Sequence, residues 1–137
     1  MIIDASVAFK WLVHEDDSDL ALALLRRDDL LAPNLVSSEV GNALWKKARR
    51  EQFDPTISHA DVLATLPSYL ALVDEHAFIG RALEIAYALD HAIYDCVYLA
   101  AAEHFGLPLV TADDRFLRKL ELTEFRSMAR TLREAVA

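Results

Sequence analysis

The sequence predicts an α/β protein in which a central, mostly parallel sheet is covered by helices on both faces. Short apolar runs that suit buried strands alternate along the chain with longer segments whose apolar residues have helical spacing. This alternation is typical of parallel sheets, because each strand returns across the sheet through a helix. The chain has 137 residues, of which 54% are hydrophobic, and this suits a single domain with one core over residues 1–137.

The expected strands are short apolar runs bounded by acidic or turn-forming residues. They are Met1–Asp4, Leu30–Ala32, Leu109–Thr111 and Glu124–Met128. The apolar run Tyr69–Val73 fits either the end of a helix or a further strand.

The expected helices fill the segments between these runs. They are Ser6–Val13, Leu20–Arg27, Val36–Arg50, His59–Leu66, Arg81–Leu89, Ile93–Phe105 and Asp114–Leu120. Ser6 is placed to cap the first of them, and Ser18 and Asp19 are placed to cap the second. Gly106 and then Pro108 end the helix Ile93–Phe105.

Two acidic residues directly follow expected strands. Asp4 comes after Ile2 and Ile3, and Asp113 closes the run that begins at Leu109. Ligands of an open parallel sheet bind in the crevice beyond the carboxyl ends of its strands. We therefore expect both carboxylates at that crevice.

Glu39 and Asp95 are expected in the first turns of two helices. The helix of Glu39 follows the second strand and so begins at the same edge of the sheet, whereas the helix of Asp95 follows another helix. Each of the four acids alone also fits a helix cap or a charge that compensates a helix dipole. Together they would repel one another without a cation, and their oxygen atoms are ligands that Mg²⁺ or Mn²⁺ prefers. Such ions activate a bound water and stabilise the leaving oxygen of a phosphodiester.

The charge of the chain bears on its partners. The net charge is −8 at pH 7, which argues against nucleic-acid affinity spread over the whole surface. It does not exclude a nuclease, because a carboxylate cleft becomes locally positive once it holds divalent cations. The single cysteine, Cys96, cannot form an internal disulfide, and no apolar run is long enough to span a membrane, so we expect a cytoplasmic protein without a membrane partner.

Four short motifs in series resemble those of PIN-domain ribonucleases, and within them the VapC-type toxins of bacterial toxin–antitoxin pairs. The first is Ile-Ile-Asp4-Ala-Ser6, with an acid two residues before a hydroxyl group. The others surround Glu39 in Ser-Ser-Glu-Val, Asp95 in Ile-Tyr-Asp-Cys-Val-Tyr, and Asp113 in Leu-Val-Thr-Ala-Asp. The resemblance covers nearly the whole chain, and the order and spacing are those of the family.

The resemblance implies a PIN-like α/β/α sandwich and a Mg²⁺- or Mn²⁺-dependent endoribonuclease that hydrolyses RNA, forms a homodimer and is inhibited by a cognate antitoxin. The ligands that it implies for the metal are Asp4, Glu39, Asp95 and Asp113. Ser6 and Thr111 would assist near the site, and Asn42 would either orient Glu39 or lie on a polar helix face. Asp114 is an extra acid beside Asp113, so either of the two could reach the metal.

Several basic residues are candidates for contact with RNA. Arg115 and Arg118 are expected closest to the cleft and are the preferred candidates. The basic run from Lys46 to Arg50 could follow an RNA backbone, but such a run is more often a solvated helix end. The five histidines are scattered, and we interpret them as surface or structural residues. An antitoxin segment is expected on apolar surface that includes Trp11 and Leu24.

Other functions fit parts of the pattern. A nuclease of the same fold that acts on DNA or on other RNA during processing would share the metal chemistry. A phospho-accepting receiver domain also gathers acids at the carboxyl edge of a sheet, but Thr111-Ala112-Asp113 stands where its lysine would be expected. A non-enzymatic binding module would be expected to have lost at least one of the four acids.

Overall fold

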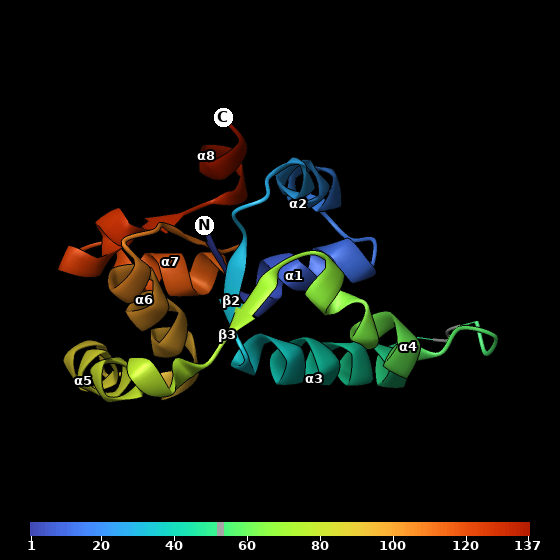
Figure 1. The fold of residues 1–137 in the computed structure, drawn as a ribbon, viewed down its shortest axis with the longest axis horizontal. Coiled ribbons are helices and arrows are strands. Elements are labelled where there is room, and N and C mark those ends of the chain that lie inside the picture. Colours follow the sequence, from blue (N-terminus) through green and yellow to red (C-terminus); the bar gives the residue numbers. More distant parts are fainter. Residues whose placement is uncertain (52–53) are drawn as a thin grey trace.

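The computed structural model, which describes residues 1–51 and 54–137, contains a five-stranded parallel sheet with the order β3-β2-β1-β4-β5 (Figure 1). The strands are β1 (Ile2–Ile3), β2 (Leu31–Pro33), β3 (Ala71–Val73), β4 (Leu109–Val110) and β5 (Ala129–Arg130). Ile2 pairs with Leu31 on one side and with Leu109 on the other, so β1 is the central strand. From β1 the chain adds β2 and β3 on one side of the sheet, and from β4 it adds β5 on the other side. The boundary between β1 and β4 is therefore the topological switch point.

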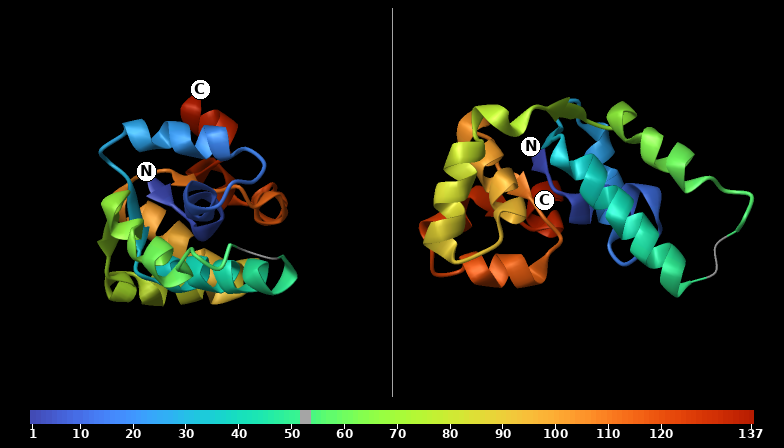
Figure 2. Two further views of the ribbon diagram at one scale, coloured as in Figure 1. Left: turned by 90° about the vertical axis from the view of Figure 1, so that its right-hand side faces the viewer. Right: turned by 90° about the horizontal axis from the view of Figure 1, so that it is seen from below.

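Helices cover both faces of this sheet. They are α1 (Ala5–Leu12), α2 (Ser18–Ala23), α3 (Leu35–Arg50), α4 (His59–Ala64), α5 (Ile79–Leu89), α6 (Ile93–Phe105), α7 (Asp114–Leu120) and α8 (Leu132–Val136). On one side, α6 contacts β1, β2 and β4, and α5 packs against α6. On the other side, α1 packs against α2 and α3. Figures 1 and 2 show the two groups on opposite sides of the strands, and the predicted α/β/α arrangement is confirmed.

The central helix α6 is apolar on nearly every side because it lies between the sheet and α5. Its residues from Cys96 to Ala102 are all buried, and three consecutive alanines allow close packing against its neighbours. Cys96 is a buried free thiol, as expected for a small apolar residue. None of the helices within the described residues has the length and apolar character needed to span a bilayer.

The caps of the first two helices differ from the expectation. Asp4, not Ser6, caps α1: its side chain accepts a hydrogen bond from the Val7 backbone N–H, and Ser6 lies inside the helix. The N-cap of α2 is Asp17, which has a left-handed backbone with φ of 61°. Ser18 lies within α2, where its hydroxyl accepts a hydrogen bond from the Glu15 backbone N–H at 3.0 Å. The predicted helix Leu20–Arg27 is thus displaced toward the N-terminus and ends in a 3₁₀ turn at Leu24–Arg26.

Two predictions about strands are resolved by the structure. The ambiguous run Tyr69–Val73 contains the strand β3. The predicted strand Glu124–Met128 is wrong, because this segment forms a 3₁₀ helix in which the Thr123 side chain accepts from the Phe125 backbone N–H. The strand begins immediately afterwards, as β5, and is followed by the unpredicted helix α8, which Thr131 and Glu134 begin with a reciprocal capping box.

The apolar residues proposed for antitoxin contact are not on the surface. Leu24 is 1% exposed and Trp11 is 8% exposed. The indole N–H of Trp11 donates a hydrogen bond to the Ala21 carbonyl at 2.8 Å, which ties α1 to α2. Both side chains therefore belong to the core, and a partner would have to contact other residues.

Two glycines provide a test of the helix geometry. Gly106 ends α6 with a positive φ of 63°, whereas Gly80 lies inside α5, where an added Cβ would meet no heavy atom within 4 Å. Gly106→Ala should lower the free energy of unfolding by about 1 kcal/mol, because the left-handed conformation is unfavourable for alanine. Gly80→Ala should raise it by about 0.5 kcal/mol, because alanine favours a helix. Urea denaturation measures both, and a shift of the same sign in the two variants would contradict this geometry.

Candidate active site

The candidate site begins with Asp4 at the switch point, where β1 passes directly into α1. The Asp4 carboxylate is only 6% exposed. Its Oδ1 atom accepts hydrogen bonds from the Ser6 hydroxyl at 2.6 Å and from the Val7 backbone N–H at 3.2 Å. The carboxylate that caps α1 is therefore held in place by two residues of the first turn of that helix.

The hydroxyl groups of Ser6 and Thr111 join the ends of the two strands at the switch point. Their oxygens lie 3.3 Å apart. The Ser6 oxygen accepts a hydrogen bond from the Ala112 backbone N–H at 2.9 Å, and the Thr111 oxygen accepts one from the Asp113 N–H at 3.0 Å. Both predicted helpers thus lie beside Asp4 and hold the loop after β4 against α1.

Glu39 is positioned by a residue that the sequence did not single out. The Tyr98 hydroxyl on α6 donates a hydrogen bond of 2.6 Å to Glu39 Oε1 on α3. Tyr98 is 2% exposed, whereas Glu39 is half-buried and reaches an open pocket between α1 and α3. The bond fixes the carboxylate across the gap between two helices that lie far apart in sequence.

Asp95 is held by His91, four residues earlier. The His91 Nε2 atom lies 2.6 Å from Asp95 Oδ2, and the imidazole packs beside the Phe116 ring with centroids 5.1 Å apart. His91, which the sequence analysis interprets as a surface or structural residue, thus lies in direct contact with one of the predicted site acids. His91 precedes α6, which begins at Ile93, and its position four residues before Asp95 is the signal that the sequence offered.

Asp113 has a capping role in this structure. Its Oδ1 accepts a hydrogen bond from the Phe116 backbone N–H at 3.0 Å and so begins α7. The second oxygen makes no hydrogen bond within the described residues. Asp114 is exposed and borders a different pocket, together with Thr111 and Ala112.

The buried carboxylates carry an electrostatic cost. Burial raises the pKa of Asp4 to about 7, although the Ser6, Thr111 and Val7 hydrogen bonds oppose the shift, and the charge of Asp95 raises it further. Burial also raises the pKa of Glu39, and Asp95 adds to that shift. The pKa of the Tyr98 hydroxyl is raised by burial and by the nearby Glu39. The structure thus brings Asp4, Glu39 and Asp95 within mutual electrostatic range around Tyr98.

These carboxylates do not form a closed cage. Within residues 1–51 and 54–137, no three acidic, histidine or cysteine side chains lie close enough together to hold one ion. The oxygen donors nevertheless fit Mg²⁺ or Mn²⁺, because Mg²⁺ usually keeps several waters and binds one or two carboxylates. A cation at this place would also offset the cost of ionising the buried Asp4.

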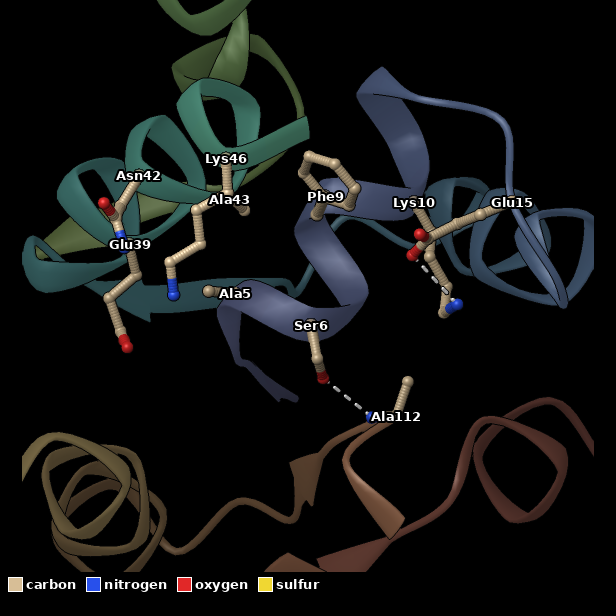
Figure 3. Close-up of a pocket in the computed structure, with 10 residues that line it drawn as sticks. All are labelled: Ala5, Ser6, Phe9, Lys10, Glu15, Glu39, Asn42, Ala43, Lys46 and Ala112. Atoms are coloured by element: carbon tan, nitrogen blue, oxygen red, sulfur yellow. Dashed lines mark hydrogen bonds and ion pairs between the residues drawn. The ribbon is translucent and has the colours of Figure 1, made fainter. Parts of the chain in front are cut away.

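The remaining candidates lie at different distances from this group. Asn42 lines the pocket of Glu39 and Ser6 (Figure 3), but the described part of the chain contains no hydrogen bond between Asn42 and Glu39. Arg115 and Arg118 are exposed on α7 and are not among the residues that line this pocket.

The raised pKa of Asp4 predicts a pH-dependent stability. The unfolded carboxyl ionises near pH 3.8 and the folded one near pH 7, so the ion-free protein should lose stability as the pH rises between these values. Asp4→Asn keeps an oxygen acceptor for Ser6 and Val7 but does not ionise. At neutral pH it should be more stable than wild type by roughly 1 to 4 kcal/mol, since one pKa unit corresponds to about 1.4 kcal/mol.

Urea titrations at several pH values in EDTA measure this effect. Asp90→Asn, at an exposed position, serves as the matched control and should keep the pH dependence of wild type. If Asp4→Asn loses as much stability as wild type between pH 3.8 and about pH 7, a group other than Asp4 causes the pH dependence.

The bond between Tyr98 and Glu39 predicts a second stability effect. Tyr98→Phe should lower the free energy of unfolding by roughly 1 to 2 kcal/mol, because a hydrogen bond to a charged group is lost. Tyr87→Phe should have no effect, because Tyr87 is 79% exposed. In a Glu39→Ala background the effect of Tyr98→Phe should shrink. An undiminished effect there would mean that Tyr98 acts through core packing alone.

Comparison with known proteins places the chain in a family. Residues 1–121 match the PIN domain family. Exonuclease VapC9 of Pyrobaculum aerophilum is 31% identical over 118 residues, which cover 86% of this chain and 84% of that protein. Ribonuclease VapC1 of Mycobacterium tuberculosis is 31% identical over 118 residues, which cover 83% and 86%, respectively.

The crystal structure of PAE2754 from Pyrobaculum aerophilum has the same fold. The two structures match with a TM-score of 0.74 and 26% sequence identity, over 98% of this chain and 90% of the other. Sequence and structure therefore agree, and the chain belongs to the PIN domain family.

Proposed function

We propose that the protein is a metal-dependent endoribonuclease and the toxin of a type II toxin–antitoxin system. The observation that carries the proposal is the buried Asp4 carboxylate at the switch point, with Asp95 and Glu39 within electrostatic range. The VapC ribonuclease among the relatives supports RNA as the substrate. A buried acid whose pKa is strongly raised, with specific charged neighbours, supports the assignment of a functional site.

The ion would be Mg²⁺ or Mn²⁺, and its ligands would come from Asp4, Glu39, Asp95 and Asp113, with one or two of these carboxylates in direct contact and the others bound through water. When bound, it supplies an activated water for attack on phosphorus and stabilises the leaving oxygen. The protein's own groups position these ligands, because ordered hydrogen bonds to metal-binding carboxylates fix their orientation.

Three contacts would do this positioning. Ser6 orients Asp4, Tyr98 orients Glu39 and His91 orients Asp95. Asp113 keeps one carboxylate oxygen free of its cap, so the capping role is compatible with a ligand role.

A cognate antitoxin, a homodimer and a cytoplasmic setting complete the proposal. They follow from the VapC-like motifs, and the antitoxin would cover the acidic site or its approach. A processing nuclease of the same fold remains the alternative, and one relative is named an exonuclease. Circular RNA separates the modes of attack, because only an endonuclease can cut a strand without ends.

Cleavage of total cellular RNA by purified protein tests the function. With Mg²⁺ or Mn²⁺ we expect discrete fragments, and with EDTA none. Asp4→Asn and Asp95→Asn should each lower the rate by at least about 100-fold, since even residues that only orient a metal ligand contribute about 10- to 100-fold.

Asp90→Asn, which removes the same charge at an exposed position, should cleave at the wild-type rate. Equal cleavage by all four proteins would reveal a contaminating nuclease and would refute the proposed site. Cleavage of linear but not circular RNA would replace the endonuclease with an exonuclease.

A further inference from the structure

A pocket between α1 and α3 adjoins the candidate site and contains a lysine. Its polar lining comes from Ser6, Lys10, Glu15, Glu39, Asn42 and Lys46. Glu39, Asn42 and Lys46 have spacings of three and four residues, so they share one face of α3. Figure 3 shows the amine of Lys46 directed from α3 into the space between Glu39 and Ala5.

Lys46 differs from Lys10 and Lys47, the two other lysines of this region, because no acidic side chain of the described residues neutralises its charge. Lys10 donates to Glu15 Oε1 at 3.1 Å and to the Asp16 carbonyl, and Lys47 pairs with Glu51 at 3.2 Å. Within the described residues, Lys46 makes no hydrogen bond and no ion pair, including with Glu39 in the same pocket. An exposed ammonium group beside the acids is thus available to an anion.

A second pocket continues from the first along α3. The two share Phe9, Glu15, Ala43 and Lys46, and the second adds Lys47, Arg50 and Glu51. Lys46 therefore lies where the pockets join, and Arg50 lies one helical turn further toward the end of α3. Neither of these two cations makes an ion pair within the described residues. A strand with regularly spaced phosphates complements such a row of charges.

We propose that Lys46 binds a backbone phosphate of the RNA next to the cleaved bond, and that the strand leaves the site along α3 toward Arg50. The inference rests on the proposed ribonuclease function. It names Lys46 and Arg50 of the basic run, which the sequence favoured as a solvated helix end, as phosphate contacts in place of Arg115 and Arg118, which do not line this pocket. A phosphate contact positions the strand without reading its bases.

Steady-state kinetics over a range of salt concentrations test the inference. The substrate is a short single-stranded RNA that contains a cleavage position mapped in total RNA. Lys46→Ala should raise KM roughly five- to thirty-fold with little change in kcat, because it removes a charged hydrogen bond made equally before and during the reaction. The slope of log(kcat/KM) against log[salt] should become shallower by about 0.7, the value for one phosphate contact on a single strand. Lys46→Arg should restore most of both quantities.

Arg49→Ala is the matched control. It removes one positive charge from the same helix, but Arg49 lies over the Trp45 ring and lines neither pocket. Its KM and salt slope should stay close to those of wild type, and thermal denaturation should show all variants folded, because Lys46 is exposed.

Two results would overturn the inference and differ in what they say of the function. The first is that wild type cleaves the RNA and Lys46→Ala has the same KM and salt slope as wild type, or that Arg49→Ala shows the same rise in KM as Lys46→Ala. Lys46 is then not a phosphate contact, and the ribonuclease function stands. If metal-loaded wild type neither cleaves nor binds RNA, the proposed function fails and the inference fails with it.

Discussion

The burial of one carboxylate at the switch point of the sheet is the constraint on which the rest of the site depends. Asp4 begins α1 by accepting the Val7 N–H, and through Ser6 the same carboxylate is linked to Thr111 and the loop after β4. The start of α1 and the contact between α1 and the loop after β4 thus both depend on the Asp4 carboxyl group. Because burial raises the pKa of that group to about 7, the apo fold bears a cost that a bound cation would remove.

The topology explains why capping residues recur at this site. Asp4 and Asp113 both follow neighbouring parallel strands, and both cap the helix that begins there. A strand followed at once by a helix places an N-cap residue at the carboxyl edge of the sheet, which is also the edge where ligands bind. For Asp113, the cap uses Oδ1 and leaves Oδ2 unbonded within the described residues. The capping role of Asp113 therefore leaves an oxygen that could bind a ligand.

The sequence was sufficient for the sheet, most helices and the strand-end acids, because these follow from local periodicity and from the geometry of parallel strands. It was insufficient for contacts that depend on how α6 lies across the sheet. The partnership of Tyr98 with Glu39 joins residues 59 positions apart, so no local pattern reveals it. The cap of α1 was misassigned because Asp4 and Ser6 are both suitable cap residues, and only the backbone conformation at Asp4 decides between them. β5 contains two residues and is too short to show any periodicity.

The distribution of charge resolves the conflict between an acidic protein and an anionic substrate. The chain has 22 acidic and 14 basic side chains, and the two joined pockets beside Glu39 contain charges of both signs. Glu15 and Glu51 neutralise Lys10 and Lys47, which leaves Lys46 and Arg50 as the lining cations without an ion pair within the described residues. At physiological salt, charges separated by more than about 8 Å are largely screened from one another. An RNA strand in this groove would therefore be governed by the nearby cations rather than by the net charge. Solvent ions screen the buried Asp4 less well from the charge of Asp95, and a divalent cation bound there would offset this repulsion while the surface stays acidic.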